Sequence, residues 1–243
     1  MTDEIVILGL NYGAHDTSAC LMKNGKLIAA CEQERYTKQK HTRDFPRDAI
    51  NDCLKKANMS INDIHEIALS WDPKLLQEEN FENIISPSRK NFKIKDLKKL
   101  KELRSQDFNL ENFIRQELNF TGRITSHLHH LCHLASCYYP SGFNDALIIC
   151  HDAVGEIDCS LMATASKGNI SIFHRGNQWP NSLGLLYAAI TDYLGWKYNS
   201  DEGIVMGLAP YGDDTQFIKS GEKTYREIFK EIIFPDEFNY EID

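Results

Sequence analysis

The chain has 243 residues, of which 42% are hydrophobic and 26% charged, and its formal net charge is −8 at pH 7. These values are typical of a globular protein whose core is formed by one large domain or by two lobes. The acidic balance argues against a broad nucleic-acid surface, so any nucleotide that binds is expected to be small.

The sequence predicts no membrane segment, because no stretch approaches the roughly 20 apolar residues that a spanning helix needs. Its first residues also lack the basic character of a signal peptide. The seven cysteines show no paired spacing, and several stand inside apolar runs, as buried thiols of a reducing compartment do. We therefore expect a cytoplasmic protein with neither a membrane nor a nucleic-acid partner.

The first seventy residues predict a strand-rich unit. Apolar runs predict strands at 4–10, 19–22, 27–31 and 65–70, and a helix is expected at 46–58. A polar turn over 11–18 separates the first two strands, and Lys23-Asn24-Gly25-Lys26 predicts a hairpin between the next two. This order of elements predicts the opening of a ribonuclease-H-like lobe.

A charged segment follows between residues 72 and 119, with a strongly basic part at 90–101. Amphipathic helices in a solvated insertion are the expected form. A binding surface that helps to shape an acceptor pocket is the alternative.

Five histidines lie between positions 127 and 151. No helix breaker precedes Pro140, so the segment before it is expected to form a helix that ends in a turn at 140–142, with His129 and His133 on one face. The next apolar strand ends at Asp152, at the sheet edge where open α/β folds place their chemistry. Two imidazoles and one carboxylate suit Fe(II), with Zn(II) as the second choice.

This spacing of histidines is common by chance, so surface or core histidines are the alternative reading of the cluster. His130 lies about 100° around the helix from His129 and is expected to pack or cap. His127 and His151 receive no role from the sequence, and packing is the expected role of Cys132.

The second half of the chain repeats the first. Strands are expected at 147–150, 158–164 and 170–173, and helices at 182–195 and 221–233. Each copy carries an acid after its first strand, Asp16 in one and Asp152 in the other. Such a duplication is typical of actin-like nucleotide-binding proteins, in which backbone N–H groups of the paired turns favour phosphates.

Six motifs follow one another between residues 5 and 212. They occupy residues 9–19, 34–46, 129–136, 152–156, 182–187 and 206–212. In this order they resemble the motifs of the NodU/CmcH-type O-carbamoyltransferases, and more distantly those of tRNA threonylcarbamoyl transferases. The resemblance implies an α/β fold of actin-like (ASKHA) duplicated ribonuclease-H-like lobes, the second incomplete in this chain. The lobes would be 1–144, with the insertion at about 72–120, and 145–243.

The resemblance also implies an activity, the transfer of a carbamoyl group to a hydroxyl of a small-molecule natural product. In the family, a C-terminal domain uses ATP to convert carbamoyl phosphate into carbamoyladenylate. Mg(II) is expected to accompany the ATP. By motif, the family's metal ligands correspond to His129, His133 and Asp152, and Lys40 corresponds to a cationic residue of the active site. His15 matches the base that takes the acceptor's proton, although it could instead fix its loop by a hydrogen bond. Lys40 could instead be a solvated lysine.

A set of residues is expected to bind the nucleotide or carbamoyladenylate. Its members are Asp16, Ser18, Gly155, Glu156, Glu202, Gly203 and Gly207. The glycines would permit close backbone approach, with ordinary turns as the alternative, and the glutamates would orient the sugar or outer metal waters.

The chain departs from the family pattern at Ile204, where a lysine is usual. We expect the chain to be the N-terminal part of an O-carbamoyltransferase, inactive alone and either truncated or completed by a partner subunit with the carbamoyladenylate-forming domain. The alternatives are a non-catalytic actin-like nucleotide-binding module and a threonylcarbamoyl-type transferase that acts on tRNA.

Overall fold

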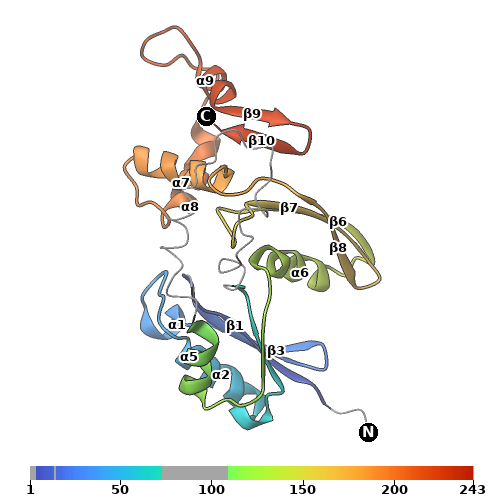
Figure 1. Cartoon of the computed structure of the whole chain (residues 1–243). Helices are drawn as coiled ribbons and strands as arrows, with labels where there is room; N and C mark the ends of the chain where they lie inside the picture. The colour runs from blue at the N-terminus through green and yellow to red at the C-terminus, as the bar shows by residue number, and fades with distance from the viewer. Residues whose placement is uncertain (1–3, 14, 73–108, 243) are drawn as a thin grey trace. The chain divides into compact units, whose positions relative to one another are not determined.

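The computed structural model describes residues 4–13, 15–72 and 109–242 (Figure 1). The chain forms two compact units, 1–132 and 133–243. The division falls inside helix α6 (His129–Ser141), whereas the boundary expected from the sequence, at 144/145, stays a prediction. Most of the expected insertion lies outside the described residues, and helix α5 (Leu110–Leu118) comes from its end.

The first unit is built on a five-stranded sheet of order β3-β2-β1-β4-β5. The strands are β1 (Val6–Asn11), β2 (Ser18–Lys23), β3 (Lys26–Glu32), β4 (Glu66–Leu69) and β5 (Arg123–Ser126). Strand β1 runs antiparallel to β2 and parallel to β4, and β4 runs parallel to β5. The strand, hairpin, helix and strand that were expected to open a ribonuclease-H-like lobe are confirmed.

The hairpin between β2 and β3 is confirmed. Asn24 and Gly25 have φ values of 50° and 75°, and positive φ at both central residues is what a type I′ turn requires. The side chain of Asn24 also accepts a hydrogen bond of 2.9 Å from the backbone N–H of Ile5. The turn is thereby tied to the residue that precedes β1.

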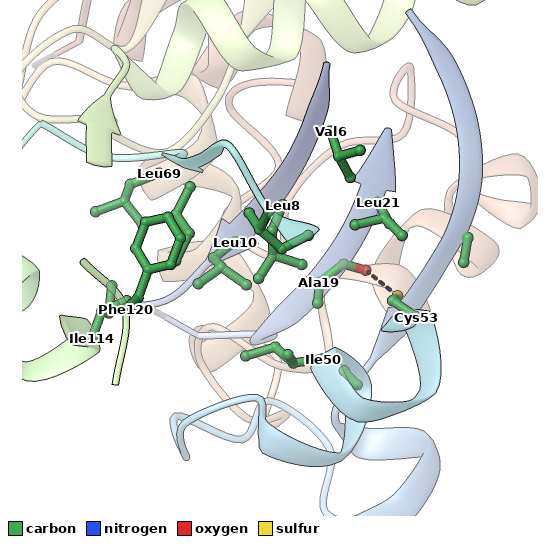
Figure 2. Packing of buried hydrophobic residues seen from close by; sticks show 14 of the residues in the cluster. Val6, Leu8, Leu10, Ala19, Leu21, Ile50, Cys53, Leu69, Ile114 and Phe120 are labelled. Atoms are coloured by element: carbon green, nitrogen blue, oxygen red, sulfur yellow. Dashed lines mark hydrogen bonds between the residues drawn. The ribbon is translucent and has the colours of Figure 1, made fainter. Parts of the chain in front are cut away.

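The core of the first unit lies between this sheet and its helices (Figure 2). Alternate residues of β1 and β2 are buried, as period-two strands require. Helix α2 (Arg47–Ala57) buries Ala49, Ile50 and Cys53, and the Cys53 thiol donates a hydrogen bond of 3.5 Å to the Ala19 carbonyl. Helix α5 adds Leu110 and Ile114. The remaining short helices of this unit are α1 (Glu34–Thr37) and η1 (Ile61–Asp63).

The second unit opens with a three-stranded antiparallel sheet of order β6-β7-β8. Its strands are β6 (Asp145–His151), β7 (Ser160–Ser166) and β8 (Asn169–Arg175). The turn between β7 and β8 has two residues of positive φ, Lys167 and Gly168, as the turn between β2 and β3 does. Each of these two strand pairs contains one register shift. The strand-turn-hairpin plan of the first unit is therefore repeated here.

Helices and a small hairpin complete the second unit. They are α7 (Leu183–Tyr193), α8 (Glu202–Leu208), η4 (Ala209–Tyr211), α9 (Tyr225–Ile232), β9 (Ile233–Asp236) and β10 (Asn239–Ile242). The helix expected at 221–233 begins only at Tyr225, because Thr224 and Glu227 form a capping box there. No helix of the described ranges combines the length and apolar character needed to cross a membrane.

The expectation of a turn at residues 140–142 is wrong in part. Helix α6 continues through Pro140 to Ser141, and Gly142, with φ of 76°, follows its end. A proline in a helix lacks the N–H donor and crowds the carbonyl of residue i−4, and α6 ends one residue after Pro140.

Candidate functional site

An imidazole and a carboxylate meet in the second unit. Nε2 of His133, on helix α6, lies 3.5 Å from Oδ2 of Asp152, which directly follows strand β6. The hydrogen bond from His133 to Asp152 raises the pKa of His133, and partial burial opposes this shift only in part. The two groups are therefore electrostatically coupled, and both present ligand atoms.

Asp152 is held by backbone contacts. Its Oδ1 accepts a hydrogen bond of 2.7 Å from the Ala153 N–H, and its own N–H donates to the Cys159 carbonyl at 2.9 Å. Its carbonyl oxygen accepts a hydrogen bond of 3.1 Å from the Ser182 hydroxyl. These contacts orient the carboxylate so that Oδ2 is the oxygen that lies toward His133.

His129 begins helix α6, one turn before His133 on the same helix. Its ring stacks on Trp71, with ring centroids 4.1 Å apart and planes at 18°. Trp71 is nearly buried and follows the end of strand β4, so the stacking restricts the rotation of the His129 ring. No sequence pattern pointed to Trp71.

His129, His133 and Asp152 form one of two groups in the described chain whose ligand atoms could hold a metal ion. The donor set of two imidazoles and one carboxylate suits Fe(II) or Zn(II). Two ligands at about 2.0–2.2 Å from a tetrahedral ion are themselves about 3.3–3.6 Å apart, and the His133–Asp152 distance of 3.5 Å falls in this range. The residues therefore fit a metal ion.

The neighbouring histidines have other surroundings. His130 is 1% exposed, in agreement with the expectation that it packs. Nε2 of His127 lies 3.2 Å from the Thr125 hydroxyl, and His151 is exposed at the end of β6. None of these three belongs to a possible metal-binding group of the described residues.

The second group lies in the first unit, at the turn after β1. Nδ1 of His15 is 2.6 Å from Oδ2 of Asp16, and Nδ1 of His41 is 3.0 Å from Oδ1 of the same carboxylate. Partial burial would raise the pKa of Asp16, but the two imidazoles outweigh it and lower this pKa below the ordinary value. His41 was missed as a site residue, although it directly follows Lys40 in the motif.

The structure places the remaining expected residues as follows. Lys40 is exposed in the turn before His41, and Ser18 is the first residue of β2. Gly155 and Glu156 are buried after β6, where the Gly155 N–H donates to the Asp158 carbonyl at 2.8 Å. Their proposed contacts with a nucleotide stay predictions.

Helix α8 contains Gly203 and Gly207, so the alternative reading of these glycines as ordinary turns is wrong. A Cβ at either position would meet no atom within 4 Å, which leaves open space beside the helix. Glu202 accepts a hydrogen bond of 2.7 Å from the Asn199 N–H, and Ile204 is 46% exposed on the same helix.

Comparison with known proteins identifies relatives. The chain is 34% identical to the nodulation protein NolNO of Sinorhizobium fredii over 203 residues, which cover 84% of this chain and 28% of that protein. It is 33% identical to an uncharacterized protein of Synechocystis over 215 residues, 85% of this chain and 35% of that protein. The chain thus spans about a third of the length of these relatives.

Among solved structures, YeaZ from Pseudomonas aeruginosa matches with a TM-score of 0.36 and 12% identity, over 70% of this chain and 65% of that one. The family described as carbamoyltransferase N-terminus matches residues 6–241. The chain belongs to this carbamoyltransferase family.

Proposed function

We propose that this chain is the carbamoyl-transferring part of an O-carbamoyltransferase that acts on a hydroxyl of a small-molecule natural product. The observation that carries the proposal is the family match over residues 6–241, within which His133 and Asp152 meet. ATP and carbamoyl phosphate would be the co-substrates, with Mg(II) on the ATP. A carbamoyladenylate-forming domain, on the same or a partner polypeptide, would supply the activated group.

The proposed metal site consists of His129, His133 and Asp152. A divalent ion bound there, Fe(II) by preference or Zn(II), would stabilise negative charge that develops on the carbamoyl carbonyl or the phosphate during transfer. The backbone contacts of Asp152 and the stacking of His129 on Trp71 support this role, because ligands that are already oriented lose little entropy when an ion binds.

His15 is the proposed general base. Its Nδ1 lies toward Asp16, so Nε2 is the nitrogen that can accept the proton of the acceptor hydroxyl. The acceptor oxygen then forms a bond to the carbamoyl carbon, the bond from this carbon to the phosphate oxygen breaks, and AMP leaves. Lys40 would pair with the phosphate during this step.

Nucleotide contacts are proposed for Asp16, Ser18, Gly155, Glu156, Glu202, Gly203 and Gly207. The open space beside Gly203 and Gly207 supports this role for the face of helix α8. Ile204 lies on the same helix and lacks the charge of the lysine that is usual there, so we expect weak nucleotide binding by this chain.

The test is reconstitution. The chain is mixed with the carbamoyladenylate-forming domain of a relative, ATP, Mg(II), carbamoyl phosphate and a panel of sugars and aminoglycosides. We expect an acceptor to gain the mass of one carbamoyl group, and we expect no transfer when the added domain is left out. Transfer by the chain alone would refute the proposed division of labour.

Substitutions connect the reaction to the site. His133→Ala should lose both the bound metal, measured by elemental analysis, and the transfer. His174→Ala, which changes another histidine of the same unit outside the site, should keep both. If His133→Ala has lost the metal but keeps full transfer, the result would favour the alternative in which this unit is a non-catalytic module.

A further inference from the structure

We propose that Asp16 is a positioning residue that fixes the ring and the tautomer of His15, and that His41 holds Asp16 in place. The inference rests on the proposed function only in calling His15 the base. Its geometric part concerns three side chains of the first unit and stands by itself.

His15 and Asp16 are neighbours in sequence, and their side chains are in direct contact. Asp16 has φ of 57°, a left-handed conformation that residues other than glycine seldom adopt but that aspartate tolerates. This conformation accompanies a separation of 2.6 Å between Oδ2 of Asp16 and Nδ1 of His15. This distance is slightly below the range of about 2.7–2.9 Å that is usual for a charge-assisted N–H···O hydrogen bond, so the two groups are in close contact.

The turn that carries His15 and Asp16 is hydrogen-bonded to the sheet. The side-chain amide of Asn11, the last residue of β1, donates to the carbonyls of His15 and Asp16 at 3.1 and 2.9 Å. The carbonyl oxygen of the same amide accepts a hydrogen bond of 2.7 Å from the Ser70 hydroxyl, just beyond β4. The turn conformation is therefore fixed by two neighbouring strands, as a functional strain requires.

His41 also contacts the carboxylate of Asp16. Its Nδ1 is 3.0 Å from Oδ1 and 3.3 Å from Oδ2 of Asp16, and its own φ of 54° is again left-handed. Nearby, the Thr17 N–H donates to the Thr42 carbonyl at 3.4 Å. The carboxylate thus contacts both imidazoles and has little freedom to turn away from His15.

These three side chains could also be ligands of a second metal ion. Two ligands of a tetrahedral ion at about 2.0–2.2 Å would be about 3.3–3.6 Å apart, clearly more than the 2.6 Å between His15 and Asp16. The short distance favours a shared proton over a shared ion.

The contact with Asp16 determines which nitrogen of His15 can accept a proton. When Nδ1 of neutral His15 carries the proton that it shares with Asp16, Nε2 keeps its lone pair and can accept a proton from a hydroxyl. His15 is otherwise exposed, with 63% of its side chain accessible, so without Asp16 its ring would sample several rotamers and both tautomers.

The test reads the tautomer by NMR. The chain is labelled with ¹⁵N at histidine, freed of metal with a chelator, and measured at about pH 8.5, above the range in which imidazoles usually titrate. We expect the Nδ1–H tautomer for His15 in the wild type and a mixture dominated by Nε2–H in Asp16→Gly. Glycine accepts the left-handed backbone, so this variant removes the carboxylate without a new steric demand.

Two further variants complete the design. His41→Asn, which also tolerates positive φ, should give an intermediate mixture for His15, whereas Lys38→Gly should not alter its tautomer. Lys38 has φ of 60° in the same connecting segment and serves as the matched control. An unchanged tautomer of His15 in Asp16→Gly overturns the proposal. So does a second outcome: His133→Ala binds Zn(II) stoichiometrically, and adding Asp16→Gly to it abolishes this binding. The three side chains would then be a metal site.

The tautomer is read without turnover, so it decides the role of Asp16 even if no transfer is detected. In the reconstituted reaction, Asp16→Asn should lower kcat by at least about tenfold while the metal content stays at the wild-type value. Loss of metal together with activity would contradict the assignment.

Discussion

Gly184 lies directly against the backbone of Ala153. A Cβ at Gly184 would be 2.7 Å from both the nitrogen and the Cα of Ala153, closer than such atoms can approach. Ser182 caps the same helix, α7, by accepting a hydrogen bond of 3.2 Å from the Leu185 N–H, and it donates to the Asp152 carbonyl. The motif at residues 182–187 therefore has a physical reason, because it seats the start of α7 on the turn that carries Asp152.

Gly184→Ala should consequently displace the Asp152 turn. We expect the free energy of unfolding to fall by about 1–3 kcal/mol, as for other overpacked sites, and the affinity for metal to fall with it. Urea unfolding and metal titration measure the two effects. Gly207→Ala is the matched control, since no atom stands within 4 Å of its Cβ and alanine in a helix gains about 0.5–1 kcal/mol over glycine. Equal stability of the two variants would contradict the close packing at Gly184.

Removal of the metal ion proposed for this site should lower the stability of the second unit. A ligand that binds only the folded state adds about 2.7 kcal/mol at a hundredfold excess over its Kd. We therefore expect a chelator to lower the Tm of the wild type and to leave that of His133→Ala and Asp152→Asn unchanged. Differential scanning calorimetry with and without the chelator gives the comparison. The same loss in all three proteins would place the ion elsewhere.

A buried side chain, Gln33, takes the place of an N-cap for helix α2. Its Oε1 accepts hydrogen bonds of 3.1 Å from the N–H groups of Asp48 and Ala49, and its Nε2 donates to Asp48 Oδ2 at 2.8 Å. Gln33→Ala leaves these donors without their partner and should cost about 1–3 kcal/mol of the free energy of unfolding. Exposed Gln39→Ala should cost less than about 0.5 kcal/mol in the same urea titration, and a similar cost for both would refute the capping role.

The sequence was informative where the signal is local. Strands β1, β2 and β3 follow from apolar alternation and from the Asn24-Gly25 turn, and the structure has them within two residues of the expected ends. Helix α8 was not expected, because two glycines in seven residues lower helix propensity.

In the candidate site, too, the local features could be predicted and the long-range contacts could not. The one-turn spacing of His129 and His133 and the strand-end position of Asp152 can be read from the sequence. Trp71 and His41 act through contacts with residues more than twenty positions away, which no local pattern encodes. The left-handed conformation of Asp16 was equally hidden, because no glycine marks it.

The cysteines provide a last prediction, on reactivity. Burial raises the pKa of Cys53 to about 11, and its side chain is fully buried against the sheet, whereas Cys137 is exposed. Since the thiolate is the reactive form, a thiol with this pKa is less than about 1% ionised at pH 8. In folded protein, N-ethylmaleimide should therefore modify Cys137 at least about a hundredfold faster than Cys53, as mass spectrometry of timed digests can measure. In guanidinium chloride the two rates should converge, because unfolding removes the burial. Equal rates in the native protein would mean that helix α2 opens readily from the sheet, and the core around Cys53 would then be less stable than its packing indicates.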